Sequence, residues 1–304
     1  MLYNSDIEQT TNINIEGKDT MNAIHAKLKI YAYSLFALTG IAVILRVCAL
    51  LTAYESDSGY FALSTPLPAM GNALLILSLL WAFSMLIFMP RGLLSDTLPD
   101  FSAASVFASA LCGFVFIFYA ALSFLNVHRG IVSFSIETAL RDRILHYLIC
   151  AAALLAGLYF LAALKPTLRT DNKRILLGFF VPIWALLALA RCYFDLAHAM
   201  NNPIKIMLQL ALIGMMLFFL QELRILMGQA QPRLGMVCTF AGLLLGGVGG
   251  VACLLSLPKL STALSDYTFE LMILTALWLY ILFRAIDTVI RNLTPAAPLT
   301  DKND

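Results

Sequence analysis

Three ionisable side chains share one face of an apolar segment and form the strongest chemical signal in the chain. Arg191, Asp195 and His198 follow one another at intervals of four and three residues, so a helix places them on a single stripe. A charge in hydrocarbon costs about 2.5 to 3.5 kcal/mol or more unless it is paired, hydrated or extends to the membrane surface. Such groups therefore mark either a binding site or a structural ion pair.

A second arginine, Arg46, lies late in the first apolar segment. The loop that follows it, Tyr54-Glu55-Ser56-Asp57-Ser58-Gly59-Tyr60-Phe61, supplies two carboxylates and several aromatic rings. These groups predict a polar pocket at the outer membrane face, in which the two arginines receive a carboxylate, a phosphate or a lipid head group. The candidate binding residues are Arg46, Glu55, Asp57, Arg191, Asp195, His198 and Glu270.

A structural interpretation of the same residues stands beside this one. Acidic side chains pair with the arginines, or the arginines extend along their aliphatic stems to the membrane surface without binding any ligand. At the cytoplasmic ends of two segments, Glu222, Arg224, Arg284 and Asp287 fit ordinary topology anchors or interhelical pairs. The residue types alone do not decide between the two interpretations.

No segment has the spacing of a catalytic or metal-binding motif. The chain lacks His-Glu-x-x-His, Gly-x-x-x-x-Gly-Lys and Gly-x-Ser-x-Gly. The 6 cysteines fall within apolar segments without a Cys-x-x-Cys pair, and the 4 histidines are widely separated. We therefore predict no cofactor, no metal ion and no catalytic residue. An acid-base role of Asp195 and His198 in a lipid-modifying enzyme stays an alternative.

These side chains belong to a strongly apolar chain. Of its 304 residues 61% are hydrophobic and only 12% are charged, about half the usual charge content of a soluble domain. The net charge of +2 and the scattered basic residues exclude nucleic-acid binding. We predict an all-α, polytopic transmembrane bundle whose eight spans each cross a hydrocarbon core of about 30 Å. The spans are residues 30–53, 67–89, 103–125, 147–164, 175–197, 204–227, 234–257 and 268–290.

The placement of basic residues predicts the orientation. Most of the 20 Lys and Arg residues fall in segments that are cytoplasmic when both termini are inside. Residues 1–29 then form a flexible polar cytoplasmic tail, residues 30–290 the transmembrane domain, and residues 291–304 a second cytoplasmic tail. The predicted location is the plasma membrane.

Two sequence features suggest how the spans are arranged. Arg46 and Arg191 lie at similar depths in the first and fifth spans, and each precedes a proline, Pro68 or Pro203, that opens the next span. This pattern predicts a 4+4 parallel repeat about an axis along the membrane normal. Pro182 removes a backbone hydrogen bond from the fifth span and predicts a kink there.

The seventh span carries Gly242, Gly246 and Gly250 at four-residue spacing. Glycines at this spacing flatten one face of a helix, so that another helix approaches closely. The partner is either a neighbouring span of the same chain or a second copy, by self-association through these three glycines.

The end of the first span also carries a resemblance. Leu45-Arg46 followed by Glu55-Ser-Asp57-Ser-Gly59-Tyr60-Phe61 resembles a pattern in uncharacterised multi-pass membrane proteins of Gram-positive anaerobic bacteria, over about the first quarter of the chain. The resemblance implies a bacterial plasma membrane and no particular activity.

We expect the protein to bind or transport a small anionic or amphiphilic solute through the outward-facing polar pocket. Its expected partners are the lipid bilayer and an anionic small molecule or lipid head group. One alternative is a non-transporting membrane subunit or structural bundle, whose charges only pair with one another. The other is the lipid-modifying enzyme mentioned above.

Overall fold

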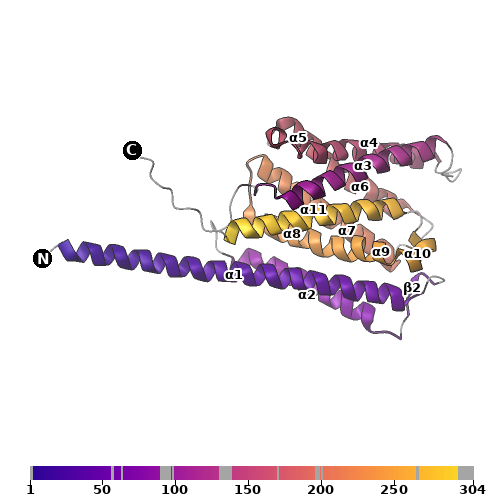
Figure 1. Cartoon of the computed structure of the whole chain (residues 1–304). Helices are drawn as coiled ribbons and strands as arrows, with labels where there is room; N and C mark the ends of the chain where they lie inside the picture. Colours follow the sequence, from indigo (N-terminus) through magenta and orange to yellow (C-terminus); the bar gives the residue numbers. More distant parts are fainter. Residues whose placement is uncertain are drawn as a thin grey trace.

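A computed structural model gives the architecture of the chain (Figure 1). The structure describes residues 3–55, 58–62, 64–89, 97, 99–129, 139–169, 171–195, 199, 201–264 and 267–293, with side chains from residue 26 onward apart from 139 and 261–264. Within these residues, eight helical spans are long and apolar enough to cross a membrane. The predicted all-α, polytopic transmembrane bundle of eight spans is therefore confirmed, and the chain is a multi-pass membrane protein whose outer helix faces contact the bilayer.

The described elements follow one another in a simple order. The first half contains α1 (Tyr3–Thr52), a short hairpin of β1 (Tyr54–Glu55) and β2 (Tyr60–Phe61), α2 (Leu67–Phe88), α3 (Ala103–His128) and α4 (Ala139–Ala162). The second half contains the single turn η1 (Pro166–Leu168), α5 (Asn172–Gly178), α6 (Phe180–Phe194), α7 (Pro203–Leu226), α8 (Pro232–Gly246), the π-helix η2 (Gly247–Val251), α9 (Ala252–Leu255), α10 (Leu257–Leu264) and α11 (Thr268–Leu293).

The two ends of the bundle differ, and we name them by what they carry. The hairpin end carries β1, β2 and α10, and the tail end is the opposite one, where α1 enters the bundle and α11 finishes (Figure 1). Both arginines singled out in the sequence lie toward the hairpin end, because each is within the last two turns of its helix.

Local sequence explains several of the helix boundaries. Asn202 caps α7 by accepting from the backbone N–H groups of Ile204 and Lys205 at 2.8 and 3.4 Å, and Pro203 begins the helix where no donor is needed. The fifth span is broken at Phe179 between α5 and α6. Pro182 cannot donate to the carbonyl of Gly178, and the interruption lies next to that missing hydrogen bond, whereas Phe179 keeps helical backbone angles, so the kink stays a prediction.

Two parts of the chain differ from the expected boundaries or extend beyond them. The fourth span begins at Ala139 rather than at residue 147, because Arg141 and Asp142 are tolerated in its first turn as an exposed ion pair of 2.9 Å. Helix α1 continues from the first span back to Tyr3, so the polar segment before residue 26 is helical. The flexibility of this tail, its side of the membrane and the 4+4 repeat stay predictions.

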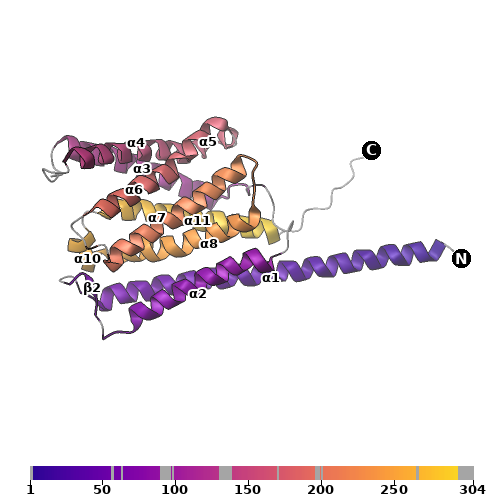
Figure 2. The ribbon, with the colours of Figure 1, turned by 180° about the vertical axis from the view of Figure 1, so that it is seen from behind.

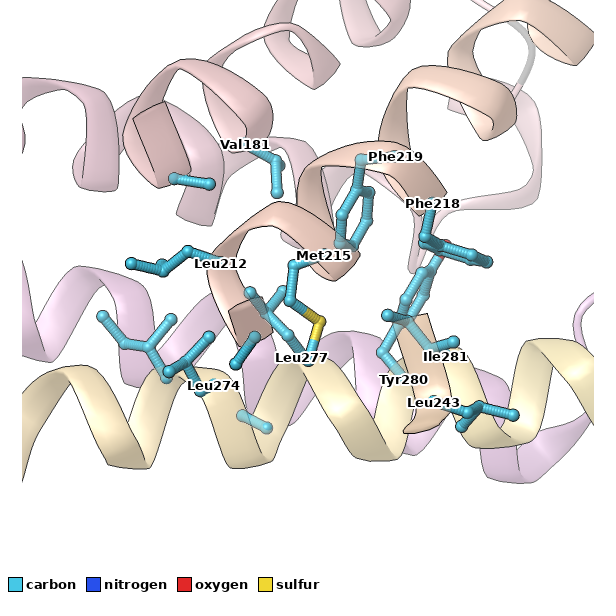
Figure 3. Close-up of a cluster of buried hydrophobic side chains, with 14 of the residues drawn as sticks. Val181, Leu212, Met215, Phe218, Phe219, Leu243, Leu274, Leu277, Tyr280 and Ile281 are labelled. Carbon is cyan, nitrogen blue, oxygen red and sulfur yellow. The ribbon is translucent and has the colours of Figure 1, made fainter. Parts of the chain in front are cut away.

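Helix α8 and its continuation occupy the centre of the bundle. The span formed by α8, η2 and α9 has 83% of its apolar window buried, more than any other span described. It packs against α7, α2, α11 and α1 (Figures 1 and 2). Around it, aromatic and aliphatic side chains from α6, α7, α8 and α11 interdigitate, among them Phe218, Phe219, Tyr280 and Ile281 (Figure 3).

The glycines of this span explain its central place. A Cβ on Gly249 would lie 2.2 Å from the carbonyl oxygen of Met207, and a Cβ on Gly246 would lie 2.2 Å from Met215 Cε. Gly242, Gly246 and Gly250 are all buried against neighbouring spans of the same chain. Self-association through these three glycines is therefore wrong, because the face that they flatten is already covered within the monomer.

Candidate functional site

The main candidate site is a cleft toward the hairpin end, which we call the Arg46 cleft. Its walls come from α1, α2, α7 and the hairpin, and its volume is about 880 Å³. The lining residues are Arg46, Glu55, Ser58, Tyr60, Phe61, Ala62, Asn72, Leu75, Ile76, Asn201, Pro203, Ile206, Met207 and Leu210. A cavity of this size lies within the range of roughly 300 to 1,000 Å³ that holds small-molecule ligands.

Arg46 is buried, at 2% exposed, and its described contacts are with neutral side chains. Its Nη2 donates to Asn72 Oδ1 at 2.8 Å and lies 3.1 Å from Met207 Sδ, and its guanidinium carbon stands 5.5 Å from the centre of the Phe61 ring. Among the described residues, no carboxylate oxygen lies within 4.0 Å of this guanidinium. A buried ion without a counter-charge costs several kcal/mol, so the cleft favours an anionic occupant.

The cleft combines this charge with largely apolar walls. Leu75 and Ile76 from α2 face Ile206 and Leu210 from α7 across it. An amphiphile can place its anionic head at Arg46 and its apolar body along these apolar side chains. The arrangement fits an amphiphile better than an inorganic ion.

The carboxylate of Glu55 lines the cleft but is held elsewhere. Ser58 Oγ donates to its Oε2 at 3.2 Å, and Glu55 pairs with Tyr60 in the hairpin register. Asp57, the other carboxylate predicted in this loop, lies outside the described residues. Glu55 and Arg46 therefore form no ion pair, unlike the acidic partners that the structural interpretation assigns to the arginines.

Arg191 belongs to a separate group of side chains, the Arg191 cluster. Its Nη1 donates to Glu270 Oε1 on α11 at 2.7 Å, and Tyr119 on α3 donates to the same oxygen at 3.1 Å. The ring of Tyr267 lies 5.9 Å from the guanidinium carbon. Here the positive charge is compensated, as the structural interpretation expects.

Asp195 lies just beyond the end of α6 and also has partners. Its carboxylate accepts from the Tyr267 hydroxyl, and its backbone oxygen accepts from Lys205 Nζ at 2.6 Å. Burial raises the pKa of Tyr267, and the bond to Asp195 adds to that shift, so this hydroxyl stays a donor. His198 lies outside the described residues.

The structure thus divides the predicted site residues between two places. Arg46 and Glu55 line the Arg46 cleft, whereas Arg191 and Glu270 line a small cavity between α6, α7 and α11. The division arises because α1 packs on α2, while α6 packs on α4 and α7. The two arginines do not share one pocket, and only Arg46 opens into a cavity large enough for a ligand.

A third group of charges at the tail end was not recognised in the sequence as one site. Arg284 on α11 lies 3.5 Å from Glu222 on α7 and 3.6 Å from Asp287, and all three are buried. Tyr280 and Tyr159 donate to Glu222 at 2.8 and 3.3 Å. The sequence predicts either topology anchors or interhelical pairs at these positions. The structure shows a buried interhelical ion pair between Arg284 and Glu222.

Phe101 brings further arginines to this tail-end cluster. The guanidinium carbons of Arg284, Arg169 and Arg174 stand 4.2, 4.7 and 5.5 Å from the centre of its ring. Arg174 is buried as well, at 3% exposed. The sequence indicated the pairing charges Glu222, Arg284 and Asp287, but tyrosines such as Tyr159 and Tyr280 within apolar spans are too common to identify a site.

In the part of the chain that the structure describes, no three His, Cys, Asp or Glu side chains gather as metal ligands would. Comparisons with known proteins give no match with any family model, curated protein or solved structure. The geometry of the Arg46 cleft is therefore the basis for a function.

Proposed function

We propose that this membrane protein binds an anionic amphiphile in the Arg46 cleft. The observation that carries the proposal is the buried Arg46 guanidinium, whose described partners are neutral and which lines a cavity of about 880 Å³. A carboxylate or phosphate at this point supplies the missing counter-charge. Charge-assisted hydrogen bonds of this kind contribute about 1.5 to 3 kcal/mol each.

The proposal extends to transport of the bound amphiphile across the membrane. Its support is the irregular helix behind the cleft, where η2 packs against α7 and Gly249 approaches the carbonyl of Met207. Single π-turns within α-helices occur frequently at functional sites, because their loosened hydrogen bonding permits small rearrangements. Met207 contacts Arg46, so a shift of η2 against α7 would reach the ligand position directly.

The membrane and the orientation belong to the same proposal. Most Lys and Arg residues lie in segments on the side of the tail end, which supports cytoplasmic termini and an outward-facing Arg46 cleft. The resemblance of the first quarter of the chain supports a bacterial plasma membrane. Binding from the outer face follows from this orientation.

The experiment is thermal unfolding of the purified protein in detergent, with decyl phosphate as the probe and decanol as its neutral counterpart. A ligand at about 100 times its Kd stabilises the native state by about 2.7 kcal/mol. We expect decyl phosphate to raise the Tm of the wild type, and decanol to have little effect.

Two variants locate the effect. In Arg46→Gln the shift with decyl phosphate should disappear, whereas in Arg141→Gln it should persist, since Arg141 is an exposed arginine paired with Asp142 at the same end. Equal shifts in wild type and Arg46→Gln would overturn the proposal. So would the absence of any shift with decyl phosphate at concentrations that leave the fold intact.

A further inference from the structure

The two long walls of the Arg46 cleft belong to helices that diverge. Helix α2 packs on α1 and α8, while α7 packs on α6 and α8, and among the described elements α2 and α7 make no extensive contact with each other. Figure 2 shows α8 behind the two, with α2 on one side of it and α7 on the other. The cleft lies between these two helices, and its lining side chains Ile76 and Ile206 are exposed, so it opens along its side, between α2 and α7.

The surface around this side opening is apolar. Helix α2 has the smallest buried share of the described spans, at 28%, and its outward side chains are large and apolar. Ile76 is 57% exposed and Ile206 is 37% exposed, and both also line the cleft. The apolar wall of the cleft is thus continuous with the lipid-facing surface.

The hairpin end of the cleft is bridged instead. The hydroxyl of Tyr60 on β2 donates to Asn201 Oδ1, just before α7, at 2.5 Å. Phe61, the neighbouring residue on β2, stands over Arg46. The described part of the hairpin thus lines the cleft at this end with polar and aromatic side chains, whereas the wall between α2 and α7 is apolar and exposed.

We infer that the ligand is a single-chain anionic lipid that enters sideways from the bilayer, between α2 and α7. Its head group lies at Arg46 and Asn72, and its chain lies along Leu75, Ile76 and Leu210 toward the hydrocarbon. The inference rests on the proposed function, because it names the source and class of the anion that Arg46 receives. It adds that the bilayer, not the aqueous phase, delivers that anion.

The test uses the full chain in lipid nanodiscs that contain palmitate or palmitoyl lysophosphatidic acid, with monopalmitoyl glycerol as a neutral control of the same chain. Bound lipid is counted by native mass spectrometry. We expect one anionic lipid per protein in the wild type and none of the glyceride. Arg46→Gln should weaken binding by about tenfold to a hundredfold, the effect of one lost charge-assisted hydrogen bond.

A pair of isoleucine variants tests the entry route. Ile76→Trp fills the side opening with a larger ring and should reduce lipid binding, although Arg46 is unchanged. Ile87→Trp is its matched control, because Ile87 is an outward side chain of the same helix, 77% exposed, that does not line the cleft. Its lipid binding should equal that of the wild type.

A second arm separates failure of this inference from failure of the proposed function. Inorganic phosphate, acetate and decyl phosphate are tested in detergent by their Tm shifts. Soluble anions could bind in an Arg46-dependent way while membrane lipids do not, or Ile76→Trp could bind lipid as the wild type does. Either result would show that lateral entry is wrong and would leave the proposed anion binding intact. If neither soluble anions nor lipids depend on Arg46, both proposals are wrong.

Discussion

Replacing Arg284 by Met tests whether the tail-end cluster stabilises the bundle. Arg284 is 2% exposed and is the nearest cation to two buried carboxylates, those of Glu222 at 3.5 Å and Asp287 at 3.6 Å. It also donates to the carbonyl of Pro99 at 3.1 Å and stacks on Phe101 at 4.2 Å. Methionine keeps an apolar stem of similar length and removes all of these interactions together.

The expected loss follows from what the substitution leaves behind. Removing one partner of a buried ion pair costs about 3 to 5 kcal/mol, because the other charge stays buried without compensation. Arg284→Met leaves two carboxylates in that condition, so we expect a loss near the upper end, about 5 kcal/mol. The exposed arginine Arg141 gives the comparison, since its pair with Asp142 should contribute about 1 kcal/mol or less.

The assay is reversible unfolding in mixed detergent micelles, read by circular dichroism, for wild type, Arg284→Met and Arg141→Met. Adding Glu222→Gln to Arg284→Met should restore part of the lost stability, because a neutral amide replaces one uncompensated carboxylate. An Arg284→Met variant as stable as Arg141→Met would refute the reasoning that this cluster is a buried, mutually compensated network.

Two further substitutions test the centre of the bundle and the Arg191 cluster. Gly249→Ala should lower the unfolding free energy by about 3 kcal/mol or more, because the new Cβ would lie 2.2 Å from the Met207 carbonyl oxygen. Gly40→Ala is the control and should not destabilise the protein, since nothing lies within 4 Å of the new Cβ. Chemical unfolding of both variants checks this, and equal stabilities would contradict it. Arg191→Gln should lose about 3 to 5 kcal/mol because Glu270, 7% exposed, keeps its charge without the cation that compensates it. A melting curve unchanged from the wild type would show that this pair is not structural.

The fold was largely predictable because its signal is local. Length and apolar composition define a span without knowledge of its neighbours, and Pro182 and Pro203 each act within one turn of helix. The start of the fourth span was misplaced because a charged turn, tolerated at the membrane surface, looks like a loop in sequence. The direction in which Gly242, Gly246 and Gly250 face could not be predicted, since it depends on which span packs against them.

The candidate site was predictable only in part, for the same reason. Arg46 and Arg191 have the same residue type and similar depth, yet one opens into a cleft and the other pairs with Glu270. This difference comes from helix rotation and from the choice of neighbouring helices, which the sequence of a single chain does not record. The pairing of Glu222 with Arg284 likewise joins residues far apart in the chain.

The most direct measurement of the central claim is the Kd of decyl phosphate for wild type and Arg46→Gln, by isothermal titration, beside the unfolding free energy of both proteins without ligand. Replacing a ligand-binding residue changes the affinity, whereas replacing a structural ion-pair partner changes the stability of the protein without ligand. We predict that Arg46→Gln weakens binding by about tenfold or more and leaves stability without ligand unchanged or higher, since no described carboxylate loses a partner. Unchanged affinity together with a loss of several kcal/mol in stability would show instead that Arg46 is a structural residue.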